Sequence, residues 1–178
     1  MSGILRVVRV ARLQASVAAE RDAMGRLCAR ITAREPTLAA GQASEGAEAV
    51  IAVSLHHYYT AVETLLTRIA REVDEDVPHG GSAHKRLLDQ LSVEIPGVRP
   101  KVLSANSYAE LDALRRFRHF FRHAYVVDLD SVQLAARAAA IRGLHESVCV
   151  DIDAWFVVMT APRDASDAGT DERGGNVG

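Results

Sequence analysis

The sequence predicts an all-α protein, an up-and-down bundle of about five helices with antiparallel neighbours. Apolar residues recur at intervals of three and four through most of the 178 residues, and no segment alternates apolar with polar residues as a strand would. Proline and glycine clusters separate these apolar stripes and set the ends of the helices. Because 48% of the residues are hydrophobic, the chain can bury a core of its own.

The N-terminal region, residues 1–44, is predicted to hold one long helix and a linker. The helix should end before Pro36, since proline cannot continue a helix. Residues 37–46 are rich in alanine and glycine and predict the linker. The apolar stripe of this helix consists of Val10, Leu13, Val17, Met24, Cys28 and Ile31.

Residues 45–160 are predicted to form the main helical domain. Its first helix should end at residues 78–81, which contain one proline and two glycines. Its stripe is the most regular in the chain and contains Leu55, Tyr59, Val62, Leu66, Ile69 and Val73. A shorter helix follows, with His84, Leu87, Leu88, Leu91 and Ile95 on one side, and residues 96–100 break the chain again.

Two further helices complete this domain. Ser107 and Glu110 form a capping-box pattern, which predicts that the next helix begins there. Asp128 and Asp130 then supply anionic caps for the last helix, and we expect His145 on its buried stripe to be a hydrogen-bonded core histidine. That stripe contains Ala138, Ile141, His145, Val148, Ile152, Trp155 and Met159. Residues 161–178 have almost nothing to bury and predict a disordered tail.

Composition limits the function classes. The formal net charge is −2, which argues against a broadly basic coat for nonspecific nucleic-acid binding, so any contact with RNA must be local. The two cysteines lie inside helical patterns and suggest no disulfide framework. Arg6, Arg9 and Arg12 interrupt every apolar run at the N-terminus, so we expect no signal peptide and no membrane span, and a cytoplasmic location.

The segment 115–125 is the most informative part of the chain. It carries four arginines and two histidines, and no acidic residue lies between Asp112 and Asp128. Such unbalanced positive charge beside titratable imidazoles suits binding and reacting with a phosphate ester. On a helix, one polar arc contains Arg115, Arg118, His119, Arg122, His123 and Tyr125. Arg118 and His123 lie toward opposite edges of this arc, so either the last turn unwinds near His123 or two copies of the helix share one site.

The order Arg118-x4-His123-x-Tyr125 resembles the R-x4-6-H motif of the HEPN superfamily, and in particular the R-x4-H-x-Y pattern of HepT-like toxins. Residues 58–66 resemble the second helix of that family, and the order of helices matches from about residue 45 to residue 160. The resemblance implies a metal-independent endoribonuclease toxin that works as a homodimer, with two motif helices lining one cleft. It also implies a minimal nucleotidyltransferase (MntA-like) antitoxin that attaches adenylate to Tyr125. His119 stands where the family usually has asparagine or another polar residue, and it either supports the site or takes part in catalysis.

The chemistry is consistent with these residue types. RNA cleavage needs no metal and no cofactor if a base activates the 2′-hydroxyl, an acid protonates the leaving 5′-oxygen and a fixed cation stabilises the phosphorane. Arg118 is the better phosphate-binding group and His123 the better proton carrier, while Arg115 and Arg122 can bind further RNA phosphates. An adenylate on Tyr125 would block RNA and neutralise the positive field.

Other interpretations stay open at this point. The chain could be a catalytically idle HEPN module for binding or dimerisation, or a small helical nucleic-acid-binding regulator, although no helix-turn-helix pattern stands out. Retention of arginine, histidine and tyrosine together favours the nuclease. A zinc site on His119 and His123, with Glu63 or His145 as a distant ligand, is disfavoured because the neighbouring arginines would repel a cation. Glu63 is either an exposed carboxylate or a partner that orients a motif arginine.

Overall fold

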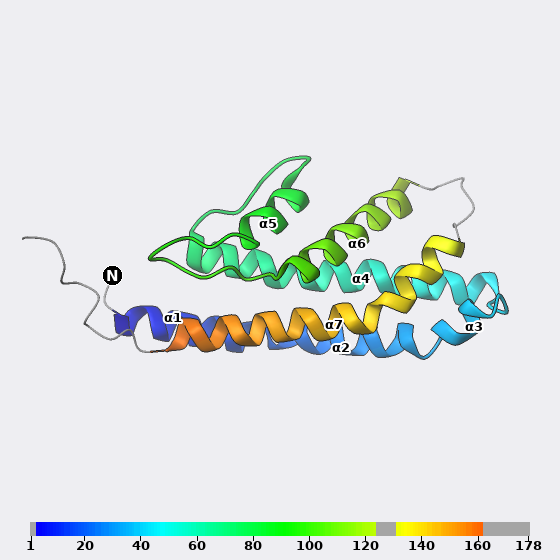
Figure 1. The fold of residues 1–178 in the computed structure, drawn as a ribbon, viewed down its shortest axis with the longest axis horizontal. Coiled ribbons are helices and arrows are strands. Elements are labelled where there is room, and N and C mark those ends of the chain that lie inside the picture. Colours follow the sequence, from blue (N-terminus) through cyan, green and yellow to red (C-terminus); the bar gives the residue numbers. More distant parts are fainter. Residues whose placement is uncertain (1–2, 124–130, 162–178) are drawn as a thin grey trace, which may run out of the picture.

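The computed structural model describes residues 3–123 and 131–161, and the side chains of residues 5–118 and 131–161 within them. These residues form an up-and-down helical bundle, which confirms the predicted all-α class (Figure 1). Helices α1 (Gly3–Ser16) and α2 (Ala18–Thr32) run in one direction and α4 (Glu45–Ile69) returns beside them. Helix α6 (Ala105–His123) runs forward again, and α7 (Ser131–Thr160) returns to the end at which α1 begins.

The predicted N-terminal helix is two helices in line, because Val17 interrupts the helical pattern between α1 and α2. The amide of Val17 still donates to the carbonyl of Leu13 at 3.1 Å, so the chain continues in nearly the same direction. All six residues of the predicted stripe are buried, in one core cluster with residues of α4 and α7. The N-terminal helices therefore pack on the same bundle as the rest of the described chain.

The predicted linker at residues 37–46 is only partly a linker. A short helix, α3 (Glu35–Ala39), has Pro36 in its first turn and buries Leu38 against the core. Proline is tolerated there because a backbone N–H in the first turn would have no acceptor within the helix. Helix α4 already begins at Glu45, with the Ser44 hydroxyl accepting from the amide of Ala47 at 3.3 Å. The expectation of a linker over this whole segment was therefore wrong, because burial of Leu38 stabilises one more helical turn.

Helix α4 ends earlier than predicted. It continues as a π-helical turn over Ala70–Asp74 and stops at Glu75, whose φ of 57° places it in the left-handed region, so residues 78–81 lie in the following loop. Five of the six predicted stripe residues are buried, and Val73 is half-buried. Helix α5 (Ala83–Leu91) follows and buries Leu87, Leu88 and Leu91, whereas Ile95 lies beyond its end in a turn around Gly97.

A buried ion pair fixes this turn to the end of the long helix. The Arg99 side chain is fully buried, and its Nε and Nη2 donate to Asp74 Oδ1 and Oδ2 at 2.6 and 2.8 Å. Its remaining N–H groups donate to the carbonyl oxygens of Val93, Gln90 and Pro100 at 2.7, 3.0 and 3.2 Å. The pair is thus bidentate and further hydrogen-bonded, which is the arrangement that a buried charge requires.

The start of the motif helix differs from the prediction. Helix α6 begins at Ala105, and its cap is Ser104, whose hydroxyl accepts from the amide of Ser107 at 3.2 Å. Ser107, the predicted cap, is fully buried inside the first turn. The Asp151 carboxylate of α7 accepts from the Ser104 amide and hydroxyl, both at 2.8 Å. A contact from the neighbouring helix therefore selects Ser104, which a capping pattern within one segment cannot show.

The stripe of α7 is largely as predicted, since six of its seven residues are buried. The seventh, His145, is half-buried, and its Nδ1 lies 3.3 Å from the Tyr58 hydroxyl of α4, which confirms a hydrogen-bonded histidine. The predicted caps Asp128 and Asp130 and residues 162–178 of the predicted tail lie outside the described residues. None of the described helices combines the length and the apolar composition that crossing a membrane requires.

His145 makes the stability of the fold depend on pH. Burial lowers its pKa below the usual value of 6.5, and Arg21 lowers it further against the opposing effect of Glu146. The unfolded chain therefore binds the proton first as the pH falls, so the contribution of neutral His145 is complete above pH 6.5 and is lost below it. We expect the free energy of unfolding to fall from about pH 7 to about pH 5 by less in His145→Gln than in the wild type, as measured by urea denaturation. Equal decreases in the two proteins would contradict this role of His145.

Candidate functional site

The structure describes the predicted site residues to different extents. Helix α6 runs through His123, and the chain that would show whether its last turn unwinds near that residue lies outside the described residues. The side chains of Arg115 and Arg118 are described. For His119, Arg122 and His123 the description is limited to their place on this helix, and Tyr125 lies outside the described residues.

The Arg118 side chain lies against two residues from other helices. Its guanidinium carbon is 5.5 Å from the ring centroid of Tyr59 in α4, within the range of a cation–π contact. Its Nη1 lies 3.5 Å from Nε2 of His84 in α5. Burial raises the pKa of Tyr59, so the ring stays neutral beneath the cation. These contacts fix the position of the guanidinium.

The guanidinium of Arg118 also retains hydrogen-bonding capacity. Its Nε is buried and has no hydrogen-bond partner within the described residues. A guanidinium group offers five N–H donors in a planar fork that matches the oxygens of a phosphate. An arginine that is fixed by a ring and an imidazole, with an unused buried donor, is therefore suited to hold an anion in one orientation.

A carboxylate supports the position of Arg118 indirectly, by bonding to His84. Glu63 of α4 bonds through Oε1 to Nδ1 of His84, and its side chain is only 17% exposed, so it is not the solvent-exposed carboxylate of one interpretation. It contacts the arginine indirectly, through the imidazole. With its proton on Nδ1 and donated to Glu63, His84 directs the lone pair of Nε2 toward the N–H groups of Arg118. Glu63, His84 and Arg118, from three helices, thus form one polar cluster, the Arg118 cluster.

His84 is the residue of the Arg118 cluster that the sequence did not predict as functional. Its spacing with the leucines placed it on the apolar side of a short helix, but its side chain is 40% exposed. Helix α5 is held on α6 by a polar contact in which the Asp89 carboxylate accepts from the Tyr108 hydroxyl at 2.7 Å and from Lys85 Nζ at 2.5 Å. The hydrogen bonds from Lys85 and Tyr108 lower the pKa of Asp89, so the contact stays ionised.

The positive charge of α6 is less unbalanced than expected. Asp112 accepts from Arg115 Nε at 2.8 Å, and its other oxygen accepts from Arg116 Nη1. Asp112 therefore compensates charge at the start of the basic segment, six residues ahead of Arg118. Of the described arginines in this segment, Arg118 has no acidic partner in direct contact.

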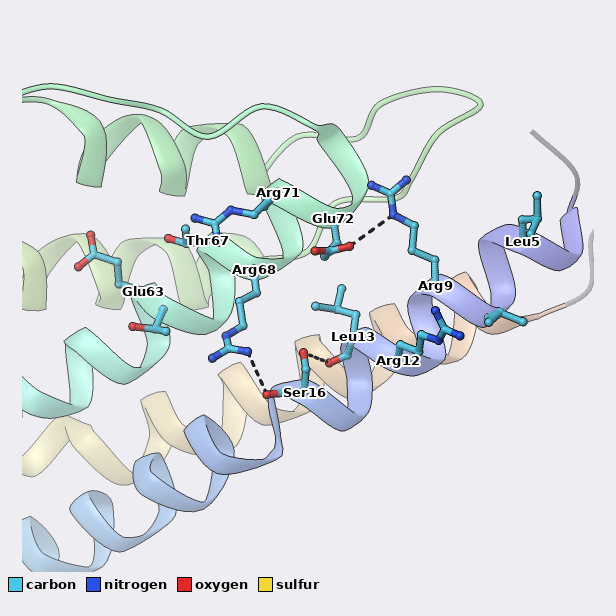
Figure 2. A pocket seen from close by; sticks show the side chains of 12 residues that line it. Leu5, Arg9, Arg12, Leu13, Ser16, Glu63, Thr67, Arg68, Arg71 and Glu72 are labelled. Atoms are coloured by element: carbon cyan, nitrogen blue, oxygen red, sulfur yellow. Dashed lines mark hydrogen bonds and ion pairs between the residues drawn. The ribbon is translucent and has the colours of Figure 1, made fainter.

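A groove lies beside the Arg118 cluster and shares Glu63 with it. It lies between α1 and the C-terminal half of α4 with its π-helical extension, and has a volume of about 1010 Å³ (Figure 2). Four arginines and two glutamates line it together with apolar and hydroxyl side chains. Glu63 is at one end of the groove and is also the partner of His84. In the part of the chain that the structure describes, no three His, Cys, Asp or Glu side chains gather as metal ligands.

The fold and this site define a HEPN-like helical domain: an antiparallel bundle in which an arginine of the basic penultimate long helix is held by groups of the neighbouring helices. The chain belongs to the HepT-like family, because the family model described as HepT-like protein matches residues 50–159. This match covers α5 and α6 entirely, α4 from its second turn onward and nearly all of α7, and it confirms the family that the sequence motif suggested. Comparisons with curated proteins and with solved structures found no match.

Proposed function

We propose that the protein is a metal-independent endoribonuclease, the toxin of a toxin–antitoxin pair. Membership of the HepT-like family supports this class of activity. The observation that carries the proposal is the Arg118 guanidinium, which is fixed between Tyr59 and His84 and keeps a buried N–H without a partner in the described structure. Such a group is expected to hold the phosphate at which the RNA chain is cut.

In the proposed reaction the ribose 2′-oxygen attacks the adjacent phosphorus, and the bond from phosphorus to the 5′-oxygen breaks. A base takes the proton of the 2′-hydroxyl, and an acid gives a proton to the departing 5′-oxygen. Arg118 binds the phosphate oxygens and stabilises the charge of the phosphorane, and His123 carries a proton. Arg115 and Arg122 bind neighbouring phosphates, and His119 supports the site. The products are a 2′,3′-cyclic phosphate and a free 5′-hydroxyl.

The proposed enzyme is a homodimer. Arg118 and His123 are five residues apart on a regular helix, which places them about 140° apart around its axis at 3.6 residues per turn. One helix therefore presents the two side chains in different directions. Two copies of α6 that face each other would bring Arg118 of one protomer and His123 of the other to the same phosphodiester.

RNA cleavage by the purified chain in the presence of a chelator tests the activity. We expect the wild-type protein to cut single-stranded RNA without metal and to leave 2′,3′-cyclic phosphate ends, and His123→Ala to be inactive. Binding of RNA without cleavage, with or without added divalent metal, would contradict the nuclease and support an idle HEPN binding module.

The proposed regulation is adenylylation of Tyr125 by a nucleotidyltransferase antitoxin. The added group is a bulky anion on the arc that holds Arg118 and Arg122, so it would exclude RNA and weaken the positive field. Mass spectrometry after co-expression with a nucleotidyltransferase should find adenylate on the wild-type chain and none on Tyr125→Phe. An unmodified wild-type chain that is nevertheless inhibited would contradict this mechanism.

The contact between His84 and Arg118 predicts a positioning role for His84. Removing the imidazole in His84→Ala frees the guanidinium to move, and a displacement of about 1 Å can cost roughly 10²-fold in rate. We expect kcat to fall more than KM rises, and His84→Gln to retain more activity because its amide oxygen can accept from Arg118. His57→Ala, which removes an exposed histidine of α4, is the matched control. Equal activity of His84→Ala and this control would contradict the role.

A further inference from the structure

The groove beside the candidate site is formed by two facing stripes of side chains (Figure 2). Residues three and four positions apart share one face of a helix, so each stripe belongs to one helical face. The stripe of α1 contains Leu5, Val8, Arg9, Arg12 and Ser16. The stripe of α4 and its π-helical extension contains Glu63, Thr64, Thr67, Arg68 and Arg71.

The four arginines of the groove are not equivalent. Arg9 Nε pairs with Glu72 at 3.4 Å, and Arg68 pairs with Glu20 at 2.9 Å. Arg12 and Arg71 are exposed, and within residues 3–123 and 131–161 neither has a hydrogen bond or an ion pair through its side chain. The groove therefore presents two uncompensated guanidinium groups, one from each wall.

The groove ends beside the Arg118 cluster. Glu63 lines its end and bonds to His84, which contacts Arg118. Arg71 lies eight residues after Glu63, about 12 Å farther along the helix at about 1.5 Å per residue. A linear polyanion that has one of its phosphates at Arg118 can thus extend past Glu63 to Arg71 and Arg12.

We propose that this groove binds the sugar–phosphate backbone of the single-stranded RNA substrate, on one side of the linkage that is cut. The inference rests on the proposed nuclease function, because it takes Arg118 as the point of cleavage. Arg12 and Arg71 bind phosphates, and the Thr67 hydroxyl lies within the groove to bind a ribose or phosphate oxygen. The hydroxyls of Ser16 and Thr64 donate to the carbonyls of Leu13 and Thr60, so they can only accept, from a ribose hydroxyl. The positive balance of the lining favours a polyanion, in a chain whose net charge is −2.

Equilibrium binding of a 2′-O-methyl single-stranded RNA, which lacks the attacking hydroxyl, tests the groove without cleavage. The logarithm of affinity should fall with the logarithm of salt concentration by about 0.7 for each phosphate contact on a single strand. The double variant Arg12→Gln/Arg71→Gln should therefore bind more weakly and show a slope smaller by about 1.4. Arg26→Gln/Arg30→Gln, which removes two exposed arginines of α2 outside the groove, should keep the wild-type slope.

Cleavage of substrates of two lengths separates the groove from the catalytic site. The groove variant should lose kcat/KM on a long RNA and cut a dinucleotide as well as the wild type does. If the wild type cuts RNA but the groove variant matches the α2 control in slope and in cleavage, the groove is not on the RNA path, and an acidic protein segment becomes its better occupant. If the wild type neither binds nor cuts RNA, the proposed function fails together with this inference.

Discussion

Arg118→Ala should reduce RNA cleavage by about 10³-fold or more and leave the fold intact. The guanidinium is the group that we assign to the phosphate, and alanine removes both its charge and its planar pair of donors. Arg118→Lys should recover only part of the loss, because an ammonium group is a point charge without the fork geometry. The side chain lies at the edge of the core over Tyr59, so its removal opens no large cavity.

Arg116→Ala is the matched control for this result. Arg116 belongs to the same helix, is 65% exposed and pairs with Asp112, which also binds Arg115. The comparison requires the cleavage rates of Arg116→Ala and Arg118→Ala on the same RNA. Circular dichroism verifies that both variants keep the helical fold. If Arg116→Ala loses as much activity as Arg118→Ala, then the total charge of the helix matters and the position of one guanidinium does not.

Asp74→Ala should destabilise the fold by about 3–5 kcal/mol. The Asp74 and Arg99 side chains are 3% and 0% exposed, so removing the carboxylate leaves a buried guanidinium with carbonyl partners but no counter-charge. The same change also detaches the end of α4 from the turn that precedes α6. Urea denaturation measures the loss, and Asp76→Ala, which removes an exposed carboxylate two residues away, should cost less than about 1 kcal/mol.

A double variant separates the charge from the packing. Replacing both partners, as in Asp74→Leu/Arg99→Met, removes the uncompensated charge and should be more stable than Asp74→Ala. A double variant that is less stable than Asp74→Ala would show that the hydrogen bonds of Arg99 to the surrounding carbonyls, rather than the ion pair, hold this region.

Periodicity predicted the helices well, because burial repeats within each helix. The six stripe residues of the first helical region are all buried, and five of the six in α4 are. The ends of the helices were less predictable, since contacts distant in sequence determine them. Asp151 selects Ser104 as the cap of α6 over Ser107, and Arg99 fixes the end of the long helix at Asp74.

In the candidate site, too, local features were predictable from the sequence and contacts between distant segments were not. The R-x4-H-x-Y spacing is a local feature and was visible in the sequence, and the family that it suggested is confirmed. The support of Arg118 comes from α4 and α5, and the hydrogen bonds of Asp89 that hold α5 against α6 are not encoded in any one segment. Glu63 was identified as a candidate partner, but the imidazole between it and the arginine required the tertiary structure.

We propose that Arg118 and His123 act on one phosphodiester where two protomers meet. Mixing Arg118→Ala with His123→Ala tests it directly, with RNA cleavage in chelator as the readout. Each variant alone should be inactive. In mixed dimers, the intact arginine of one chain faces the intact histidine of the other, and we predict that cleavage returns. A mixture that forms dimers and stays inactive, while the wild type cuts RNA, would contradict the shared site.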